Sequence, residues 1–292
     1  MFTSELPLPM IDALIVRALE EDLGAGDVTT EACVPEDKLA TAHGVARKEI
    51  VACGLPVAGR VFTTVDPSIR FTPKVEEGAK VKAGTTLFTL EGRARALLTG
   101  ERVALNLVQR MCGIATMTRR YVEALPEGSP TRVTDTRKTT PGLRLLERYA
   151  VRRGGGHNHR NDLGSAVLIK DNHIVAAGGV RTAIERARAR APHTSKIECE
   201  VDSLDQLEEA LAAGADIVLL DNMDTATVEE AVRRTRGRAL LEASGGITLE
   251  RIGELARAGV DAISVGALTH STPAADIGLD FVARGSRPPS AA

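Results

Sequence analysis

The chain has 292 residues, which is enough for one large domain or two ordinary ones with a sizeable buried core. Hydrophobic residues make up 43% and charged residues 26%, an ordinary globular balance, and the net charge of -2 argues against a general nucleic-acid or membrane surface. Only 2% of the residues are aromatic and none is Trp, so a flat ligand must be held by charge and backbone rather than by stacking.

Cysteine spacing and the absence of targeting segments predict a cytoplasmic protein. The four cysteines lie far apart without a CxxC pair, which gives no zinc or redox motif and is typical of a reduced compartment. The first 24 residues lack the basic start and the cleavable apolar segment of a signal peptide. No apolar run approaches the roughly 20 residues that a membrane helix needs.

The N-terminal part of the chain predicts a small α+β domain. A helix is expected around Met10–Glu21. From about Thr41 to Thr99, short alternating runs separated by Gly and Pro predict a largely antiparallel sheet. A long helix is expected from about Gly100 to Leu125, with a candidate kink or break at Cys112-Gly113.

Beyond Thr131, short apolar runs alternate with amphipathic helices. This pattern is typical of a parallel sheet that is buried on both faces. At least six such units without a long interruption favour a (β/α) barrel over an open sheet. The runs are RVTDTRK, AVLIKDNH, KIECEV, DIVLLDN, ALLEASGG and DAISVGA, and the helical segments are VRTAIERARARA, SLDQLEEALAA, VEEAVRRTR and TLERIGELARA.

The predicted fold is therefore of the α/β class, with a C-terminal (β/α) barrel of six to seven strands and an N-terminal α+β sandwich domain. We assign residues 1–115 to the sandwich domain, with residues 271–284 joining it, and residues 116–270 to the barrel. Residues 285–292, which are rich in Ser and Pro, are predicted to form a flexible tail.

Polar residues cluster where each apolar run ends. In parallel barrels the active site lies at the carboxyl ends of the strands, so we expect these residues to meet in one mouth. The alternative is that strand ends are polar because loops are solvated, but this explains Lys170 and Glu200, directly next to apolar runs, less well. The residues concerned are Arg137, Lys138, Lys170, Asp171, Glu200, Asp221, Ser244 to Gly246 and Ser264 to Gly266.

The stretch from Arg132 to Lys170 is strongly cationic. It holds nine Lys or Arg and three Asp or Glu, so its net charge is +6 in a chain whose total is -2. Such a site predicts a polyanionic small ligand. Arg144, Arg148, Arg152 and Arg153 fall in a helical segment and are interpreted as solvated charges, whereas Arg137, Lys138, Arg160 and Lys170 are interpreted as binding residues.

The motif GGGHNHR (154–160) joins a glycine loop to two histidines and Arg160. Successive glycines let the backbone approach a ligand closely. His157 and His159 suit either a metal pair or donors to an anion. The missing third ligand at a recognisable spacing favours the donors.

Two carboxylates and two glycine-containing loops complete the predicted site. Glu200 and Asp221 end adjacent strands and suit ribose hydroxyls or Mg2+, with a structural salt bridge as the alternative, which Glu198 fits best. SGG (244–246) and SVGA (264–267) end the last two strands, where barrels commonly bind a phosphate through backbone N–H groups. This inventory fits a sugar that carries phosphate and pyrophosphate, beside an anionic acceptor.

Beyond these inferences, TRKTTPGLRLLERYAVRRGGGHNHR (136–160) and AVLIKDNH (166–173) resemble the quinolinate phosphoribosyltransferase family. The resemblance covers nearly the whole chain. One departure is Ser165, where the family usually has an Asp. The other matching blocks are DLGAGDVTT (22–30), ERVALNLVQRMCGIAT (101–116), ECEVDSL (198–204), VLLDNM (218–223), EASGGI (242–247) and ISVGALTHS (263–271).

The resemblance implies that quinolinate and phosphoribosyl pyrophosphate react to nicotinate mononucleotide, pyrophosphate and CO2, in de novo NAD biosynthesis. It implies Mg2+ and a homodimer or a hexamer of dimers. The implied quinolinate-binding residues are Arg137, His159, Arg160 and Lys170, with Arg102 arriving from a partner subunit. The implied phosphoribosyl pyrophosphate site comprises Thr136, Lys138, Glu200, Asp221, Ser244, Gly245, Gly246, Ser264, Val265 and Gly266, of which Lys138, Glu200 and Asp221 are catalytic and Glu200 and Asp221 bind the metal.

Three other functions remain open at this point. A paralogue within the family would act on a different acidic acceptor. A phosphate-binding barrel lyase or isomerase would need only two carboxylates and a lysine. A non-catalytic anion-binding protein is disfavoured, because Glu200 and Asp221 would weaken anion binding.

Overall fold

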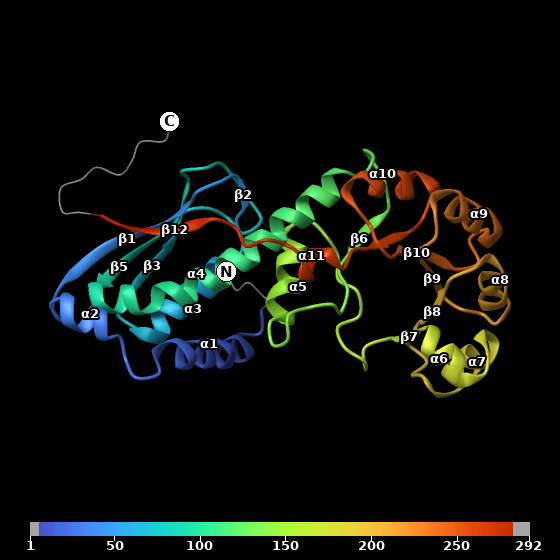
Figure 1. The fold of residues 1–292 in the computed structure, drawn as a ribbon, viewed down its shortest axis with the longest axis horizontal. Helices are drawn as coiled ribbons and strands as arrows, with labels where there is room; N and C mark the ends of the chain where they lie inside the picture. Colours follow the sequence, from blue (N-terminus) through green and yellow to red (C-terminus); the bar gives the residue numbers. More distant parts are fainter. Residues whose placement is uncertain (1–5, 283–292) are drawn as a thin grey trace. The chain divides into compact units, whose positions relative to one another are not determined.

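A computed structural model describes residues 6–282, and these form two compact units (Figure 1). Within the described residues, the first unit contains residues 6–117, 140–155 and 272–282, and the second contains residues 118–139 and 156–271. The segment 140–155 therefore belongs to the first unit, although the sequence-based division left it in the barrel. The expected flexible tail, residues 285–292, lies outside the described residues.

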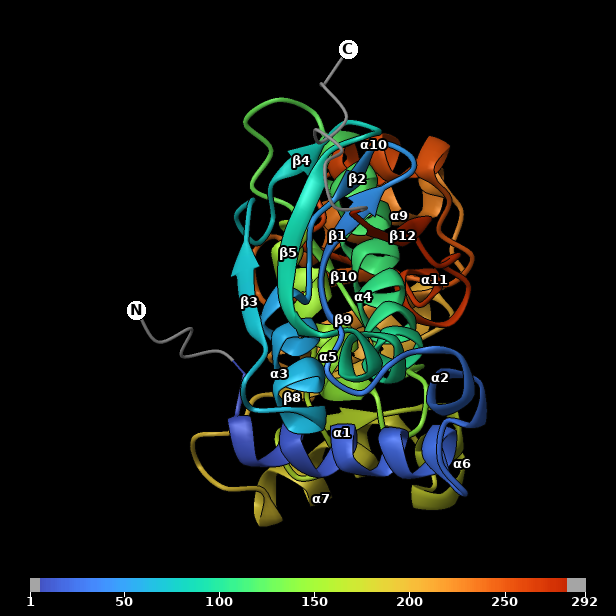
Figure 2. The ribbon, with the colours of Figure 1, turned by 90° about the vertical axis from the view of Figure 1, so that its left-hand side faces the viewer.

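The first unit is built on an antiparallel sheet with the strand order β12-β1-β5-β3. Helix α3 packs against β3, and α1 packs against α3 (Figure 2). The α+β prediction for this region is confirmed. Its elements are α1 (Leu8–Leu23), α2 (Val28–Cys33), β1 (Leu39–Ala46), β2 (Ile50–Val51), α3 (Leu55–Val65), β3 (Arg70–Pro73), β4 (Lys80–Val81), β5 (Thr86–Arg93), most of α4 (Ala94–Glu123), α5 (Arg144–Arg153) and β12 (Ile277–Phe281).

The long helix α4 runs without interruption from Ala94 to Glu123, so of the candidate kink or break at Cys112-Gly113 the break is wrong. The glycine has another purpose. A Cβ at Gly113 would lie 2.2 Å from the carbonyl oxygen of Pro273, which is far closer than any real contact. Gly113 thus lets the returning chain pass directly against the helix, and its cost to helix propensity is small beside that contact.

The second unit contains six parallel strands in the order β6-β11-β10-β9-β8-β7, with helices on the outside of the sheet (Figure 1). All six predicted strands are present, which confirms the α/β barrel-like class. No helix within residues 6–282 is long and apolar enough to cross a membrane. The elements are β6 (Arg132–Thr134), β7 (Val167–Ile169), α6 (Asp171–Ala177), α7 (Val180–Arg190), β8 (Ile197–Val201), α8 (Leu204–Ala212), β9 (Ile217–Asp221), α9 (Thr225–Thr235), β10 (Leu240–Ser244), α10 (Leu249–Ala258), β11 (Ala262–Ser264) and α11 (Ala267–His270).

Strand alternation sets the depth of each functional side chain. Residues two apart on a strand point to the same face of the sheet. Glu198 and Glu200 therefore share a face on β8, with Glu198 one step further from the carboxyl end. Glu242 and Ser244 have the same relation on β10. Each of these strands thus contributes one polar residue at its end and a buried glutamate below it.

Candidate active site

A pocket of about 510 Å3 lies at the carboxyl ends of the strands of the second unit. It gathers every site residue that the family resemblance implied except Arg102, Val265 and Gly266, and of the predicted strand-end residues Asp171 also lies outside it. The common mouth expected from the strand ends therefore exists. The lining residues are Thr136, Arg137, Lys138, His159, Arg160, Leu168, Lys170, Glu200, Leu219, Asp221, Asn222, Glu242, Ser244, Gly245, Gly246 and Ser264.

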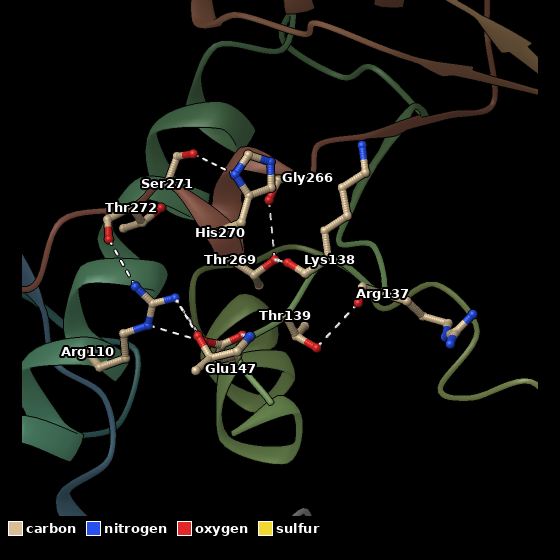
Figure 3. A network of polar contacts seen from close by, with 11 residues as sticks. Arg110, Arg137, Lys138, Thr139, Glu147, Gly266, Thr269, His270, Ser271 and Thr272 are labelled. Atoms are coloured by element: carbon tan, nitrogen blue, oxygen red, sulfur yellow. Dashed lines mark hydrogen bonds and ion pairs between the residues drawn. The ribbon is translucent and has the colours of Figure 1, made fainter. Parts of the chain in front are cut away.

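Lys138 is held by its backbone, which leaves its ammonium group extended (Figure 3). Its N–H donates to Thr136 Oγ1 at 3.1 Å, and its carbonyl oxygen accepts the Thr269 hydroxyl at 2.8 Å. A Cβ at Gly266 would lie 3.2 Å from the Lys138 Cδ, so the lysine chain passes close to this glycine. The turn after β6 thus fixes the base of the side chain, and Gly266 leaves room for its stem.

Arg160 and Arg137 are like charges in one pocket. Burial, and then the charge of Arg137, lowers the pKa of the Arg160 guanidinium. Arg160 Nη1 donates to the Ala166 carbonyl oxygen at 3.2 Å, which ties the side chain to the segment before β7. Two guanidinium groups that repel each other in a partly desolvated wall favour an anion between them.

Lys170 and Glu200 form an ion pair inside the pocket. The Lys170 side chain is 46% exposed and that of Glu200 only 13%, so the carboxylate is the better shielded partner. On the next strand, Asp221 Oδ2 accepts Asn222 Nδ2 at 2.8 Å. Both acids line the same pocket from adjacent strands, where they offer oxygen ligands of the kind that Mg2+ prefers.

The ring of His159 lies between two buried carboxylates. Its Nε2 is 3.2 Å from Glu198 Oε2 and 3.6 Å from Glu242 Oε1. One ligand atom from each of these residues lies within 4.8 Å of the others, so this is a possible cation cluster among the described residues, and His157 is not a member. Glu198 is a buried structural residue, as predicted, but its partner is the His159 ring rather than an arginine or lysine, and His157 and His159 do not form a metal pair.

Glu242 lines the pocket but escaped the sequence analysis. Burial, followed by the charge of Glu198, raises its pKa to about 7. The available signal was an acid inside an apolar run, two residues before Ser244 in ALLEASGG. Asn222, Leu168 and Leu219, which also line the pocket, carried no such signal.

The loop after β10 requires a glycine at position 245. Its φ is +88°, and a Cβ there would lie 2.1 Å from Asn222 Oδ1. Asn222 itself has a positive φ of 53° and donates its N–H to the Ser244 carbonyl oxygen at 3.0 Å. The ends of β9 and β10 are therefore locked together, which fixes Asp221 and Ser244 side by side in the register of the two strands.

The structure places the remaining predicted site residues elsewhere. Val265 is 1% exposed, and its N–H donates to the Thr134 carbonyl oxygen at 2.9 Å, so this amide already has an acceptor. Gly266 lies beside the Lys138 stem but does not line the pocket. Arg102 is exposed on α4 in the first unit.

One interpretation of the cationic stretch changes. Arg148 is 8% exposed, so its interpretation as a solvated helix charge is wrong. Arg152 is exposed, as predicted, and Arg153 is half-buried; their guanidinium groups lie 5.9 and 4.8 Å from the centroid of the Tyr149 ring. A helix that packs into the first unit buries such a face, and sequence spacing alone did not reveal this.

Ser165, which departs from the family pattern, organises its own loop. Its hydroxyl accepts the N–H groups of Asn161 and Asp162 at 3.0 and 3.1 Å. Asp162 Oδ1 accepts the Gly164 N–H at 2.9 Å. The turn between Arg160 and β7 is therefore closed by short polar side chains.

Comparison with known proteins agrees with the fold and the site. Family models for the N-terminal and C-terminal domains of quinolinate phosphoribosyl transferase match residues 27–112 and 114–280. The carboxylating nicotinate-nucleotide pyrophosphorylase of Mycobacterium leprae is 48% identical over 273 residues, covering 91% of this chain and 95% of the relative. The solved structure of NadC from Streptococcus pyogenes superposes with a TM-score of 0.90 at 43% identity, covering 95% and 99% of the two chains.

These matches, which span both units, define a phosphoribosyltransferase of the two-domain type. The chain belongs to the quinolinate phosphoribosyltransferase family.

Proposed function

We propose that this protein transfers the phosphoribosyl group of phosphoribosyl pyrophosphate to quinolinate, releasing pyrophosphate and CO2 and giving nicotinate mononucleotide for de novo NAD biosynthesis. The observation that carries the proposal is a single pocket that holds four cations and, at adjacent strand ends, two of its three carboxylates. The cations are Arg137, Lys138, Arg160 and Lys170, and the two carboxylates at the strand ends are Glu200 and Asp221. A dicarboxylate and a pyrophosphate both need cations to bind them, and the hydroxyl groups of a ribose need carboxylate acceptors.

In this mechanism the pocket works by charge and orientation. Arg137, Arg160 and Lys170 bind the carboxylates of quinolinate, and Lys138 stabilises the charge that develops on the leaving pyrophosphate. Glu200 and Asp221 bind the ribose hydroxyls and steady the cationic character at its C1 carbon. The ring nitrogen has a free electron pair, so its attack needs alignment and no general base.

Decarboxylation follows from the bond that the first step makes. Once the ring nitrogen carries the ribose, the ring is cationic and accepts the electron pair left when the adjacent carboxylate departs as CO2. The vacated carbon then takes up a proton. The arginine wall favours quinolinate as the bound anion, while the electron demand of the ring drives the loss of CO2.

Mg2+ belongs to this proposal. Glu200 and Asp221 supply two carboxylates within one pocket, and oxygen donors beside a pyrophosphate are the ligand set that Mg2+ uses in such enzymes. When bound, the ion would neutralise pyrophosphate charge. The chain's own contribution is to hold Glu200 against Lys170 and Asp221 against Asn222.

The proposal includes a homodimer or a hexamer of dimers in which Arg102 reaches the quinolinate site of a partner subunit. The exposure of Arg102 on α4 supports this, because an arginine that acts in another subunit must project from its own. The cytoplasmic location expected from the sequence is part of the same proposal.

Incubation of the purified protein with quinolinate, phosphoribosyl pyrophosphate and Mg2+ tests the activity. We expect equal amounts of pyrophosphate and CO2. Pyrophosphate without CO2 would mean that phosphoribosyl pyrophosphate is hydrolysed or that the transfer stops before decarboxylation. Pyrophosphate release that requires another aromatic acid in place of quinolinate would indicate a paralogue. Folded protein that releases neither contradicts the proposal.

A further inference from the structure

Both nitrogens of the His159 ring are engaged within the protein. Nδ1 accepts the backbone N–H of Arg160 at 2.7 Å, while Nε2 faces Glu198 and Glu242 at 3.2 and 3.6 Å. A ring nitrogen that accepts a hydrogen bond carries no proton, so Nε2 carries the proton and directs it to the carboxylates. The side chain is 11% exposed, so its ring packs into the wall of the pocket.

The same segment is also fixed through its backbone. Asp135, which is fully buried at the end of β6, accepts the His159 N–H at 2.8 Å and the Asn158 side-chain amide at 2.6 Å. Carboxylates from β8, from β10 and from the residue that follows β6 therefore converge on residues 158 and 159. Such convergence from separate strands fixes a loop much more firmly than contacts from one neighbour.

Stability alone does not account for the two glutamates. Glu198 and Glu242 are each 5% exposed, and Glu242 Oε1 accepts no hydrogen bond. Buried carboxylates that lack full hydrogen bonding cost free energy, and apolar side chains of similar size would cost less at these positions. A role at the pocket explains why acids stand there.

We propose that Glu198 and Glu242 are positioning residues, which clamp the His159 ring so that it holds the Arg160 backbone and thereby aims the Arg160 guanidinium at a carboxylate of the pyridine substrate. This inference rests on the proposed function. The chain of contacts is short: two carboxylates hold one ring, and the ring accepts the N–H of the next residue.

The far end of Arg160 makes this clamp effective. Its Nη1 donates to the Ala166 carbonyl oxygen, so the side chain spans between the ring-anchored backbone and the segment before β7. With both ends fixed, the guanidinium meets the substrate with little loss of conformational freedom. Without the ring clamp, the backbone end moves, and a displacement of about 1 Å is costly for oriented binding.

Single substitutions of both glutamates test the clamp by steady-state kinetics. Glu198→Leu removes the carboxylate within hydrogen-bond distance of Nε2, and Glu242→Leu removes the second carboxylate, which faces it at 3.6 Å. In both variants we expect the KM for quinolinate to rise roughly tenfold while kcat and the KM for phosphoribosyl pyrophosphate change less than about twofold. Glu242→Gln keeps an acceptor oxygen, so its KM for quinolinate stays near that of the unsubstituted protein.

A spectroscopic readout separates the clamp from a general loss of structure. Nitrogen NMR of histidine-labelled protein reports the tautomer of His159, which we expect to be protonated at Nε2 in the unsubstituted protein and in Glu242→Gln. In Glu242→Leu we expect that signal to become mixed or broadened. His159→Phe identifies the resonance.

Asp216→Asn serves as the matched control in the same unit. Asp216 accepts the Ile197 N–H at 2.7 Å and pairs with Arg188 at the opposite ends of the strands. We expect it to lower thermal stability without changing the KM for quinolinate.

Three results would overturn the clamp: an unchanged KM in both leucine variants, an equal rise in both substrate constants, or a divalent cation bound by the unsubstituted protein that Glu242→Gln loses and Asp221→Asn keeps. Lack of turnover by the unsubstituted protein would instead reject the proposed function, and the tautomer measurement would remain interpretable.

Discussion

Glu147 in the first unit and Glu242 in the second are both buried glutamates, at 0% and 5% exposure, but their surroundings differ. Glu147 Oε1 accepts Arg110 Nε and Nη2 at 3.1 and 2.8 Å (Figure 3). Its Oε2 accepts the Thr140 N–H at 3.1 Å. Glu242 Oε1 accepts no hydrogen bond, and the pKa of Glu242 is raised to about 7 by burial and by Glu198. A saturated buried acid joins distant segments, whereas an undersaturated one marks the wall of a binding site.

Replacement of Glu147 should have the largest effect on stability. Glu147→Leu leaves the Arg110 guanidinium, only 24% exposed, without its carboxylate, and we expect the free energy of unfolding to fall by about 3 kcal/mol. Urea unfolding at fixed protein concentration measures this. Glu185→Ala, which breaks an exposed pair with Arg181, should change it by less than about 0.5 kcal/mol. A similar loss of unfolding free energy in both variants would contradict the expectation that the buried glutamate stabilises the fold more than the exposed one.

Arg137→Ala and Arg160→Ala should leave the fold intact and weaken substrate binding. Each removes a charged donor to a carboxylate, worth about 1.5–3 kcal/mol, so we expect the KM for quinolinate to rise about 10- to 100-fold. Steady-state kinetics with quinolinate as the varied substrate measures this. Arg233→Ala on the outer face of α9 is the control and should retain the original constant. An unchanged KM in both pocket variants would show that the dicarboxylate binds elsewhere.

Stability should fall as the pH rises through the range in which Glu242 titrates. Its pKa is raised from 4.5 to about 7 in the folded protein, so between these values the folded state keeps a proton that the unfolded chain has lost.

We expect a loss of about 2 kcal/mol between pH 5 and 8 and a much flatter profile for Glu242→Gln. Urea unfolding over this range measures it. Parallel profiles for the two proteins would assign the effect to other groups.

The smallest expected effect concerns the loop that joins β9 and β10. Gly245→Ala places a Cβ against Asn222, whereas Gly214→Ala adds one in open space at a similar positive φ of 81°. Gly214→Ala should lose about 1–2 kcal/mol to backbone strain, and Gly245→Ala should lose more because its Cβ also collides with Asn222. Only Gly245→Ala should also raise the KM for phosphoribosyl pyrophosphate, which kinetics alongside unfolding will measure. Equal kinetics in the two variants would argue against a role for this loop.

The fold was largely predictable because its elements follow local patterns. Buried parallel strands read as short apolar runs and their helices as amphipathic segments, which placed all six strands of the second unit. The errors arose where tertiary contacts decide. Gly113 resembles a helix break, but it accommodates Pro273, and Arg148 resembles a solvated charge, but it is buried. The local sequence of residues 140–155 does not show that Glu147 pairs with Arg110, a contact within the first unit.

The site residues that lie at the ends of strands were predictable from the sequence. Lys170, Glu200 and Asp221 follow apolar runs directly, and parallel topology brings such positions to one edge. Glu242 was missed because it lies within a run, where its side chain follows the alternation toward the interior. The Val265 N–H donates to the carbonyl oxygen of Thr134, 131 positions earlier in the chain. No local sequence pattern reveals such a distant hydrogen bond.

The pairing of β12 with β1 has a consequence for biosynthesis. Ile277 pairs with Ala46 and Phe281 with Ala42, so the sheet of the first unit needs a strand that follows the whole second unit along the chain. A ribosome delivers the complete second unit before that strand emerges. The edge of β1 therefore stays unpaired while the rest of the chain is synthesised, and an unpaired edge can pair with strands of other chains. Chaperone dependence and aggregation during expression should accordingly respond to changes in β12 more than to changes in the barrel strands.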